Sequence, residues 1–174
     1  MRRITLITTG GTIEKTYDER TGALDNQRSI VRRMLRRLRT EDASISIIEL
    51  MSKDSLVMTA GDRDRICEVV NAVVGGASAG ARTADGVVIL HGTDTLAETG
   101  LRLLQSVGVP HVPIVLTGAM RPFEMVRSDA LQNLTEALFA AGTLAPGVYC
   151  VAHGRALRFP DVRKDRERGT FVGA

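Results

Sequence analysis

Four short stretches of the chain carry residue types that acyl-transfer chemistry needs. They are TTGGT (8–12), HGTDT (91–95), TGAMRP (117–122) and DVRK (161–164). Together they offer two threonine hydroxyls, Thr12 and Thr93, the carboxylate of Asp94 and the amine of Lys164. A threonine hydroxyl is a weak nucleophile, and a lysine held beside an aspartate could supply the base that activates it. Backbone N–H groups in the glycine-containing turns could hold an oxyanion.

The same residues also have simpler roles. Threonines in turns commonly bond to nearby backbone groups, and Asp94 could cap the helix that follows it. Lys164 lies in the charge run DVRKDRERG, where a solvated side chain is the ordinary interpretation. The glycines of TTGGT could cradle a phosphate, but neither GxGxxG nor GxxxxGK[ST] occurs in the chain. From residue types alone, acyl transfer competes with turn and cap roles.

The elements that must position these loops follow from the apolar pattern. We expect strands at residues 3–8, 44–50, 86–90, 113–116 and 147–152. VVIL and PIVL are continuous apolar runs, which is typical of parallel strands covered on both faces. Apolar residues at helical spacing predict helices over residues 30–38, 66–74, 96–107 and 131–138.

This alternation predicts an α/β fold with a doubly wound, mostly parallel sheet, helices on both faces, and one domain over residues 1–174. Ligands of such folds bind at the carboxyl ends of the strands. TTGGT, HGTDT, TGAMRP and HGRALRFPDVRK follow the first, third, fourth and fifth expected strands. We therefore expect these loops to converge on one edge of the sheet. The stretch after the fifth strand has too little apolar content for another strand-and-helix unit.

Composition excludes several classes of protein. The 174 residues are 44% hydrophobic and 25% charged, with a net charge of +3, which is ordinary for a soluble globular protein. The histidines and cysteines show no metal-ligand spacing, so no metal is expected. No apolar run suits a signal peptide or a membrane span, so a cytoplasmic protein without membrane partners is expected.

The stretch RSIVRRMLRRLR (28–39) predicts a helix with one apolar and one arginine-rich face. Such a face could bind anionic lipid or RNA, which would make the chain an interaction module. A surface helix that merely solvates its basic side is the simpler interpretation. We therefore do not expect a nucleic acid partner.

TTGGTI (8–13), HGTDT (91–95) and TGAMRP (117–122), in this order and in these loops, closely resemble the bacterial-type L-asparaginase/glutaminase family. The resemblance covers nearly all of the chain but only the family's N-terminal domain, so the smaller C-terminal domain is expected to be missing. It implies a parallel α/β fold and hydrolysis of L-asparagine to L-aspartate and ammonia through a threonine acyl-enzyme. It implies no metal or organic cofactor, and a homo-oligomer is expected.

The resemblance also implies catalytic roles. Thr12 matches the threonine nucleophile, and Tyr17 would be its partner on a mobile loop that closes over the substrate. Thr93, Asp94 and Lys164 match a Thr–Lys–Asp group.

The implied substrate contacts involve further residues. Ala119 would form the oxyanion hole with the Thr93 N–H, Asp94 would hold the substrate α-amino group, and Ser52 would hold the α-carboxylate. Lys53 stands where the family usually has glutamine, so a cation replaces an amide and L-glutamine stays an alternative substrate. An asparaginase-like subunit of a tRNA-dependent amidotransferase would use the same residues, but it would need extra domains for which this chain has no room.

Overall fold

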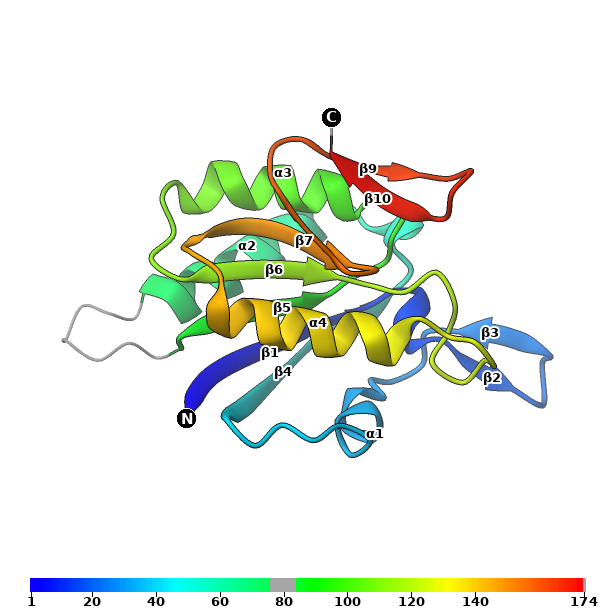
Figure 1. Ribbon diagram of the computed structural model, residues 1–174. Coiled ribbons are helices and arrows are strands. Elements are labelled where there is room, and N and C mark those ends of the chain that lie inside the picture. The colour runs from blue at the N-terminus through cyan, green and yellow to red at the C-terminus, as the bar shows by residue number, and fades with distance from the viewer. Residues whose placement is uncertain (76–83, 174) are drawn as a thin grey trace.

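The computed structural model describes residues 1–75 and 84–173 of the chain (Figure 1). Its main sheet has six strands in the order β4-β1-β5-β6-β7-β8. The strands are β1 (Arg2–Gly10), β4 (Ala43–Lys53), β5 (Gly86–Leu90), β6 (Pro113–Thr117), β7 (Gly147–Ala152) and β8 (Arg155–Arg158). All neighbours up to β7 pair in parallel, and β8 pairs with β7 in the antiparallel sense. The five expected strands and the mostly parallel sheet are thus confirmed. Residues 76–83, part of the stretch GGASAGARTAD (75–85) whose composition indicates a loop, lie outside the described residues.

Helices cover both faces of the sheet, as expected (Figure 1). Helices α1 (Val31–Leu35) and α4 (Ala130–Thr143) belong to one apolar cluster, and α2 (Ala60–Gly75) and α3 (Leu96–Val107) to the other. Strand β5 divides its side chains between the two clusters: Val88 joins the α4 side, and Val87 and Ile89 join the α3 side. Because both faces of this strand are buried, its side chains are apolar at successive positions, which explains the continuous apolar run.

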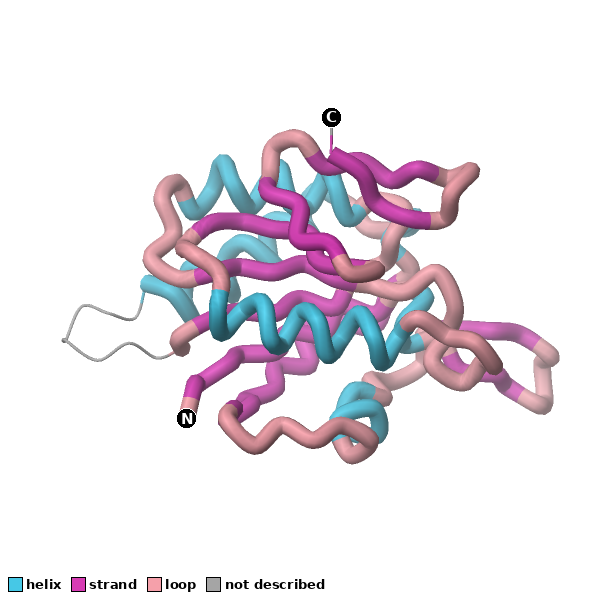
Figure 2. Tube along the Cα trace, in the orientation of Figure 1, coloured by secondary structure: helices cyan, strands magenta, loops and turns pink. Residues whose placement is uncertain are grey.

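Two small hairpins were not expected from the sequence. They are formed by β2 (Thr16–Asp18) with β3 (Ala23–Asp25), and by β9 (Val162–Asp165) with β10 (Thr170–Gly173). Figure 2 shows both of them at the margins of the main sheet. Their strands are short, and each pairs with its own partner strand, so they lack the long apolar pattern of a core strand. The hairpin β9–β10 is nevertheless anchored, because Val162 and Phe171 join the cluster of α2 and α3.

The expected arginine-rich helix is much shorter than residues 28–39. Only Val31–Leu35 is α-helical, and the N-cap position is Ile30, which offers no side-chain acceptor. Without such an acceptor the start of the helix lacks the stabilisation that a Ser, Thr, Asp or Asn cap supplies. The apolar side of the segment does pack in the core, through Val31 and Met34.

Across the two described ranges, no helix has the length and apolar character that crossing a membrane requires.

Candidate active site

The glycines of TTGGT allow three strand ends to meet. Gly11 has φ 78° and ψ 179°, a conformation open essentially to glycine alone. A Cβ atom at Gly11 would overlap the backbone of Gly92, and one at Gly10 would overlap the backbone of Lys53. The end of β1 therefore packs directly against the chain that leaves β5 and β4. Since Thr12 follows Gly11 and Thr93 follows Gly92, this contact brings the two threonines to the same edge of the sheet.

Thr12 begins the short 3-10 turn η1 (Thr12–Glu14). Its neighbours Ile13 and Glu14 are buried, whereas Thr12 itself is partly exposed. Among the described residues, no hydrogen bond involves the Thr12 hydroxyl. The turn thus holds the backbone of Thr12 firmly and leaves its hydroxyl available.

Glu14 fixes this turn from inside the protein, and no sequence motif pointed to it. One oxygen of its carboxyl group accepts from the Gly10 N–H at 3.2 Å, and the other accepts from the Ser29 hydroxyl at 2.5 Å and the Ile30 N–H at 3.3 Å. Burial raises the pKa of Glu14 to about 7. The carboxyl group therefore joins the end of β1 to the start of α1.

Lys164 connects Thr93 and Asp94 of the HGTDT loop. Its Nζ atom donates to the Thr93 hydroxyl at 2.8 Å and to Oδ1 of Asp94 at 3.0 Å. Both charged side chains are largely shielded from solvent. The hairpin β9–β10 makes this contact possible, because it returns over the HGTDT loop after the main sheet is complete. The structure thus brings together Thr93, Asp94 and Lys164.

Arg166 is a further cation at this point that the sequence pattern did not indicate. Its guanidinium lies 2.9 Å from Oδ1 of Asp94, the oxygen that also accepts from Lys164. The Arg166 side chain is 69% exposed, so it lies at the solvent side of the pair. Asp94 therefore carries two cationic neighbours.

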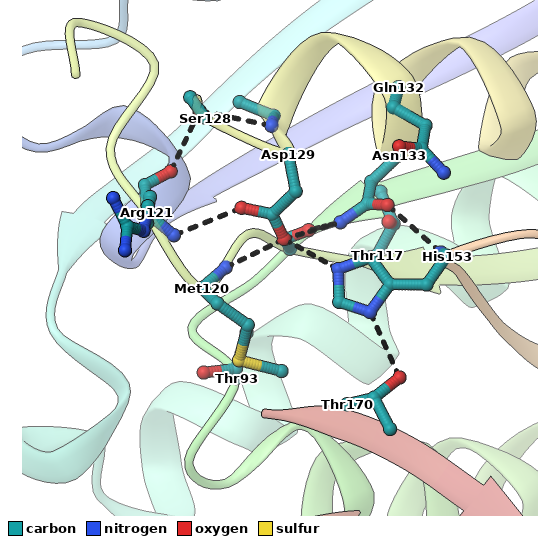
Figure 3. A network of polar contacts seen from close by, with 12 residues as sticks. Thr93, Thr117, Met120, Arg121, Ser128, Asp129, Gln132, Asn133, His153 and Thr170 are labelled. Atoms are coloured by element: carbon teal, nitrogen blue, oxygen red, sulfur yellow. Dashed lines mark hydrogen bonds and ion pairs between the residues drawn. The ribbon is translucent and has the colours of Figure 1, made fainter. Parts of the chain in front are cut away.

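Two backbone donors of the expected oxyanion hole are available. Within the described ranges, neither the Thr93 N–H nor the Ala119 N–H takes part in a hydrogen bond. A Cβ atom at Gly118 would overlap the His91 carbonyl and crowd the Thr93 methyl group, so the loop after β6 lies against the HGTDT loop. The next two N–H groups, of Met120 and Arg121, instead bind Asp129 at 2.9 and 3.0 Å (Figure 3).

The end of β4 and the turn that follows it supply hydroxyl groups. The Ser52 hydroxyl is buried and, within the described chain, has no hydrogen-bond partner. The same holds for the hydroxyl of Ser55, a residue that is 1% exposed and packs against Gly92. Only Ser52 was expected from the sequence. The family motif indicated it, whereas the position of Ser55 against Gly92 becomes visible only in the fold.

Lys53 points to the start of α2. Its Nζ atom donates to Asp62 at 2.7 Å, and this bond is the main cause that lowers the pKa of Asp62 to about 2. Asp62 also accepts from the N–H of Thr59 at 2.9 Å, as expected of an N-terminal capping pair. Lys53 is therefore engaged in helix capping in this structure.

Lys15 and Asp54 form an ion pair beside the site. Their charged groups lie 2.6 Å apart, which ties the turn after Thr12 to the loop after β4. The hydrogen bond from Lys15 is the main cause that lowers the pKa of Asp54, and the charge of Lys164 contributes as well.

Within the described residues, no hydrogen bond joins Tyr17 to Thr12. Tyr17 lies in the β2–β3 hairpin with 57% of its surface exposed, and its N–H donates to Glu124 at 3.1 Å. Within the described residues its phenol has no hydrogen-bond partner. The hairpin projects from the end of the sheet where the strands lead into these loops (Figure 1).

His91 holds the HGTDT loop in place from the interior of the protein. It is fully buried, and burial lowers its pKa to about 4. Its Nδ1 lies 2.8 Å from the Gly92 carbonyl and its Nε2 lies 2.9 Å from the Thr99 hydroxyl. A neutral ring that donates from Nδ1 and accepts at Nε2 satisfies both contacts. His91 thus orients the loop.

The parallel α/β sheet thus carries two threonine-bearing glycine turns and a Lys–Asp pair at its carboxyl edge, a set of groups suited to acyl transfer. The model of the family "Asparaginase, N-terminal" matches residues 3–170. The chain therefore belongs to the asparaginase family.

Amidotransferase subunits and L-asparaginases are among the known proteins that resemble the chain. The D subunit of the glutamyl-tRNA(Gln) amidotransferase from Methanococcus vannielii is 33% identical over 164 residues, which is 88% of this chain and 35% of that protein. An L-asparaginase of Thermococcus kodakarensis is 49% identical over 65 residues, 37% of this chain and 20% of that protein.

Solved structures show the same relationship. The thermostable L-asparaginase of T. kodakarensis superposes with a TM-score of 0.81 at 29% identity, over 98% of this chain and 51% of that one. A probable cytoplasmic L-asparaginase of Campylobacter jejuni gives a TM-score of 0.78 at 28% identity, over 94% of this chain and 48% of that one. The chain thus spans about a third of the first curated relative and about half of these solved structures.

Proposed function

We propose that this chain hydrolyses the side-chain amide of L-asparagine to L-aspartate and ammonia through an acyl-enzyme on Thr12. The observation that carries the proposal is the contact of Lys164 with both Thr93 and Asp94, directly beside the Gly11–Gly92 contact that positions Thr12. Family membership supports an amide substrate.

In the first half of the reaction, Oγ of Thr12 attacks the carboxamide carbon. The oxyanion that forms is held by the free N–H groups of Thr93 and Ala119. The C–N bond then breaks, the Thr12 proton reaches the leaving nitrogen, and ammonia departs from a β-aspartyl ester. Tyr17 is the proton-transfer partner that the family resemblance supplies. Tyr17 is exposed in this structure, and we propose that the β2–β3 hairpin closes over the substrate to bring its phenol to Thr12.

In the second half, water attacks the ester carbonyl. Lys164 first gives one proton to solvent; the Thr93 hydroxyl then passes its own proton to Nζ of Lys164 as it accepts the proton of the attacking water. The ester C–O bond breaks, Thr12 recovers its proton, and L-aspartate leaves. Asp94 keeps the Lys164 amine aimed at Thr93.

The α-groups of the substrate would bind around these residues. Asp94 would hold the α-ammonium, and the buried, unpaired hydroxyl of Ser52 would hold the α-carboxylate. Ser55 offers a second such hydroxyl three residues further along the chain. Lys53 would reach the carboxylate only by breaking its bond to Asp62, so a role of Lys53 in substrate binding has less support. Preference for asparagine over glutamine, a cytoplasmic location and a homo-oligomer stay predictions.

A second candidate is ammonia release for a partner enzyme. It is favoured by the amidotransferase D subunits that match the chain over 88% of its length. The site chemistry would be the same. The interaction-module alternative has less support, because Arg32 pairs with Glu49, and Arg33 pairs with Glu124.

The test is ammonia release from L-asparagine and, in parallel, from L-glutamine. We expect Thr12→Ala to lower kcat by about a thousandfold or more, and Thr12→Ser to retain measurable turnover. Mass spectrometry of quenched enzyme should show one aspartyl group on Thr12. Wild-type turnover in Thr12→Ala would exclude the role of Thr12. Turnover that requires an amidotransferase partner would favour the second candidate.

A further inference from the structure

A series of hydrogen bonds connects the loop that carries Ala119 with the hairpin that carries Lys164, two segments far apart in the sequence. It begins at Asp129, at the N-cap position of α4, and ends at Thr170 in β10 (Figure 3). Its middle member is His153, in the turn between β7 and β8. The Nε2 atom of His153 lies 2.8 Å from Oδ2 of Asp129, and its Nδ1 lies 2.9 Å from the Thr170 hydroxyl.

At one end, Asp129 shapes the loop that carries Ala119. Its carboxylate accepts the N–H groups of Met120 and Arg121, which leaves the N–H of Ala119 as a free donor beside them. Burial opposes the charge of Asp129, but the bonds from Met120, His153 and Arg121 more than compensate and lower its pKa. Asp129 is therefore an anion that can only accept hydrogen bonds.

Asn133, one turn further along α4, adds a second attachment. Its amide nitrogen donates to the Gly118 carbonyl and to Asp129, each at 2.9 Å, and its oxygen accepts the His153 N–H at 3.0 Å. The loop before Ala119 and the turn at His153 are thus attached to the same face of α4.

At the other end, Thr170 fixes the orientation of the hairpin that carries Lys164. Thr170 pairs with Asp165, the residue after Lys164, in the β9–β10 ladder. Phe171 anchors the hairpin in the core, but apolar contacts do not fix direction. The hydrogen bond to His153 is directional. Since Asp129 only accepts, Nε2 of His153 donates to it, and Nδ1 is hydrogen-bonded to the Thr170 hydroxyl.

The backbone of His153 supports a special role for this position. His153 has φ 54°, a left-handed conformation that costs free energy for a side chain other than glycine. Such strain persists only where surrounding contacts impose it. Here the bonds of its N–H and both ring nitrogens impose it.

We propose that His153 is a positioning residue. Through Asp129 and Thr170, it fixes the position of the Ala119 N–H, the oxyanion donor, relative to the amine of Lys164. This inference rests on the proposed function. His153 has no hydrogen bond to Thr93 or Lys164 within the described chain, and it acts through the loop at one end and the hairpin at the other.

The test compares Thr170→Val with Thr170→Ser in the full chain. Valine keeps the branched shape and removes the hydroxyl, whereas serine keeps the hydroxyl. We expect Thr170→Val to lower kcat for L-asparagine about tenfold with KM changed less than about twofold, because small misplacements of catalytic groups are costly. Thr170→Ser should keep at least half of the kcat. Unchanged kcat in Thr170→Val, or an equal loss in Thr170→Ser, would overturn the proposal.

Thr143→Val is a matched control, since the Thr143 hydroxyl bonds to Phe139 within its own helix.

A second measurement, hydrogen exchange, does not depend on enzyme turnover. In Thr170→Val, hydrogen exchange should become faster at Met120 and Arg121, on the far side of His153, while Val88 in the sheet stays protected. Faster exchange confined to β9–β10 would overturn the link. Absence of ammonia release by the wild type would instead refute the proposed function, and the exchange result would still decide the link.

Discussion

The amine of Lys164 lies 2.8 Å from the hydroxyl of Thr93, although 71 positions separate the two residues in the sequence. The same amine binds Asp94 at 3.0 Å. This contact joins the last hairpin of the chain to the loop after the central strand β5. It makes the hairpin part of the site.

Lys164→Met should remove the amine and keep most of the apolar stem. If Lys164 serves ester hydrolysis, kcat for L-asparagine should fall at least about a hundredfold, and the aspartyl-enzyme should accumulate. Arg163→Met is the matched control, because Arg163 precedes Lys164 on the same strand and is exposed. Rapid kinetics with mass detection of the acyl-enzyme checks both variants. A kcat close to that of wild type in Lys164→Met would contradict the role.

Arg166→Ala should strengthen binding of substrates that carry an α-ammonium group. Arg166 and Lys164 share Oδ1 of Asp94, so removing the exposed guanidinium should leave the carboxylate more attractive to a substrate cation. We expect KM for L-asparagine to fall about two- to fivefold with little change in kcat, and the effect to shrink in high salt. Arg168→Ala serves as the control on the same hairpin. A higher KM in Arg166→Ala would mean that Arg166 binds the substrate itself.

Ser52→Ala and Ser55→Ala should separate the two candidates for carboxylate binding. Both hydroxyls are buried and lack partners within the described chain, so neither substitution breaks an existing side-chain hydrogen bond. Loss of one hydrogen bond to a charged group should raise KM about tenfold. Steady-state kinetics of the two variants decides which serine holds the substrate. Equal KM values in wild type and both variants would exclude both serines from carboxylate binding.

Glu14 should make stability depend on pH near neutrality. Its pKa is about 7 in the folded chain, against an ordinary value of 4.5, so the folded state binds this proton more tightly than the unfolded state does. The resulting stability is fully present below pH 4.5 and is lost as the pH rises through 7, by about 3 kcal/mol.

Glu14→Gln tests this dependence because glutamine cannot ionise. The free energy of unfolding of this variant, relative to wild type, should rise by about 3 kcal/mol between pH 4.5 and pH values above 7, as urea titrations can measure. A constant difference over this range would contradict the prediction.

Gly11→Ala should be far more destabilising than Gly169→Ala. Both glycines have positive φ, but a Cβ at Gly11 would overlap Gly92, whereas at Gly169 nothing lies within 4 Å. Gly169→Ala should cost about 1–2 kcal/mol from backbone strain alone. Gly11→Ala should cost clearly more, because the β1 and β5 loops must separate. Thermal unfolding compares the stability of the two variants. An equal loss of stability in both would refute the close contact between Gly11 and Gly92.

The main sheet and most of the candidate site could be predicted from the residues in order along the chain. Continuous apolar runs such as VVIL reveal strands buried on both faces, because successive side chains point to opposite faces and all of them must then be apolar. The parallel order places the strand ends together, so Thr12, Thr93 and Asp94 could be assigned to one edge. Lys164 was assigned from the family motif, and its contacts support that choice.

The remaining parts depend on contacts between distant segments, which local pattern does not encode. The β9–β10 hairpin has no long apolar pattern, and it is held in place because Phe171 packs in the core. Arg166, Ser55 and Glu14 acquire their surroundings only when distant loops meet in the folded chain. Residue type also left the direction of Lys53 open, because a flexible lysine pairs with the carboxylate that the fold brings nearest, here Asp62.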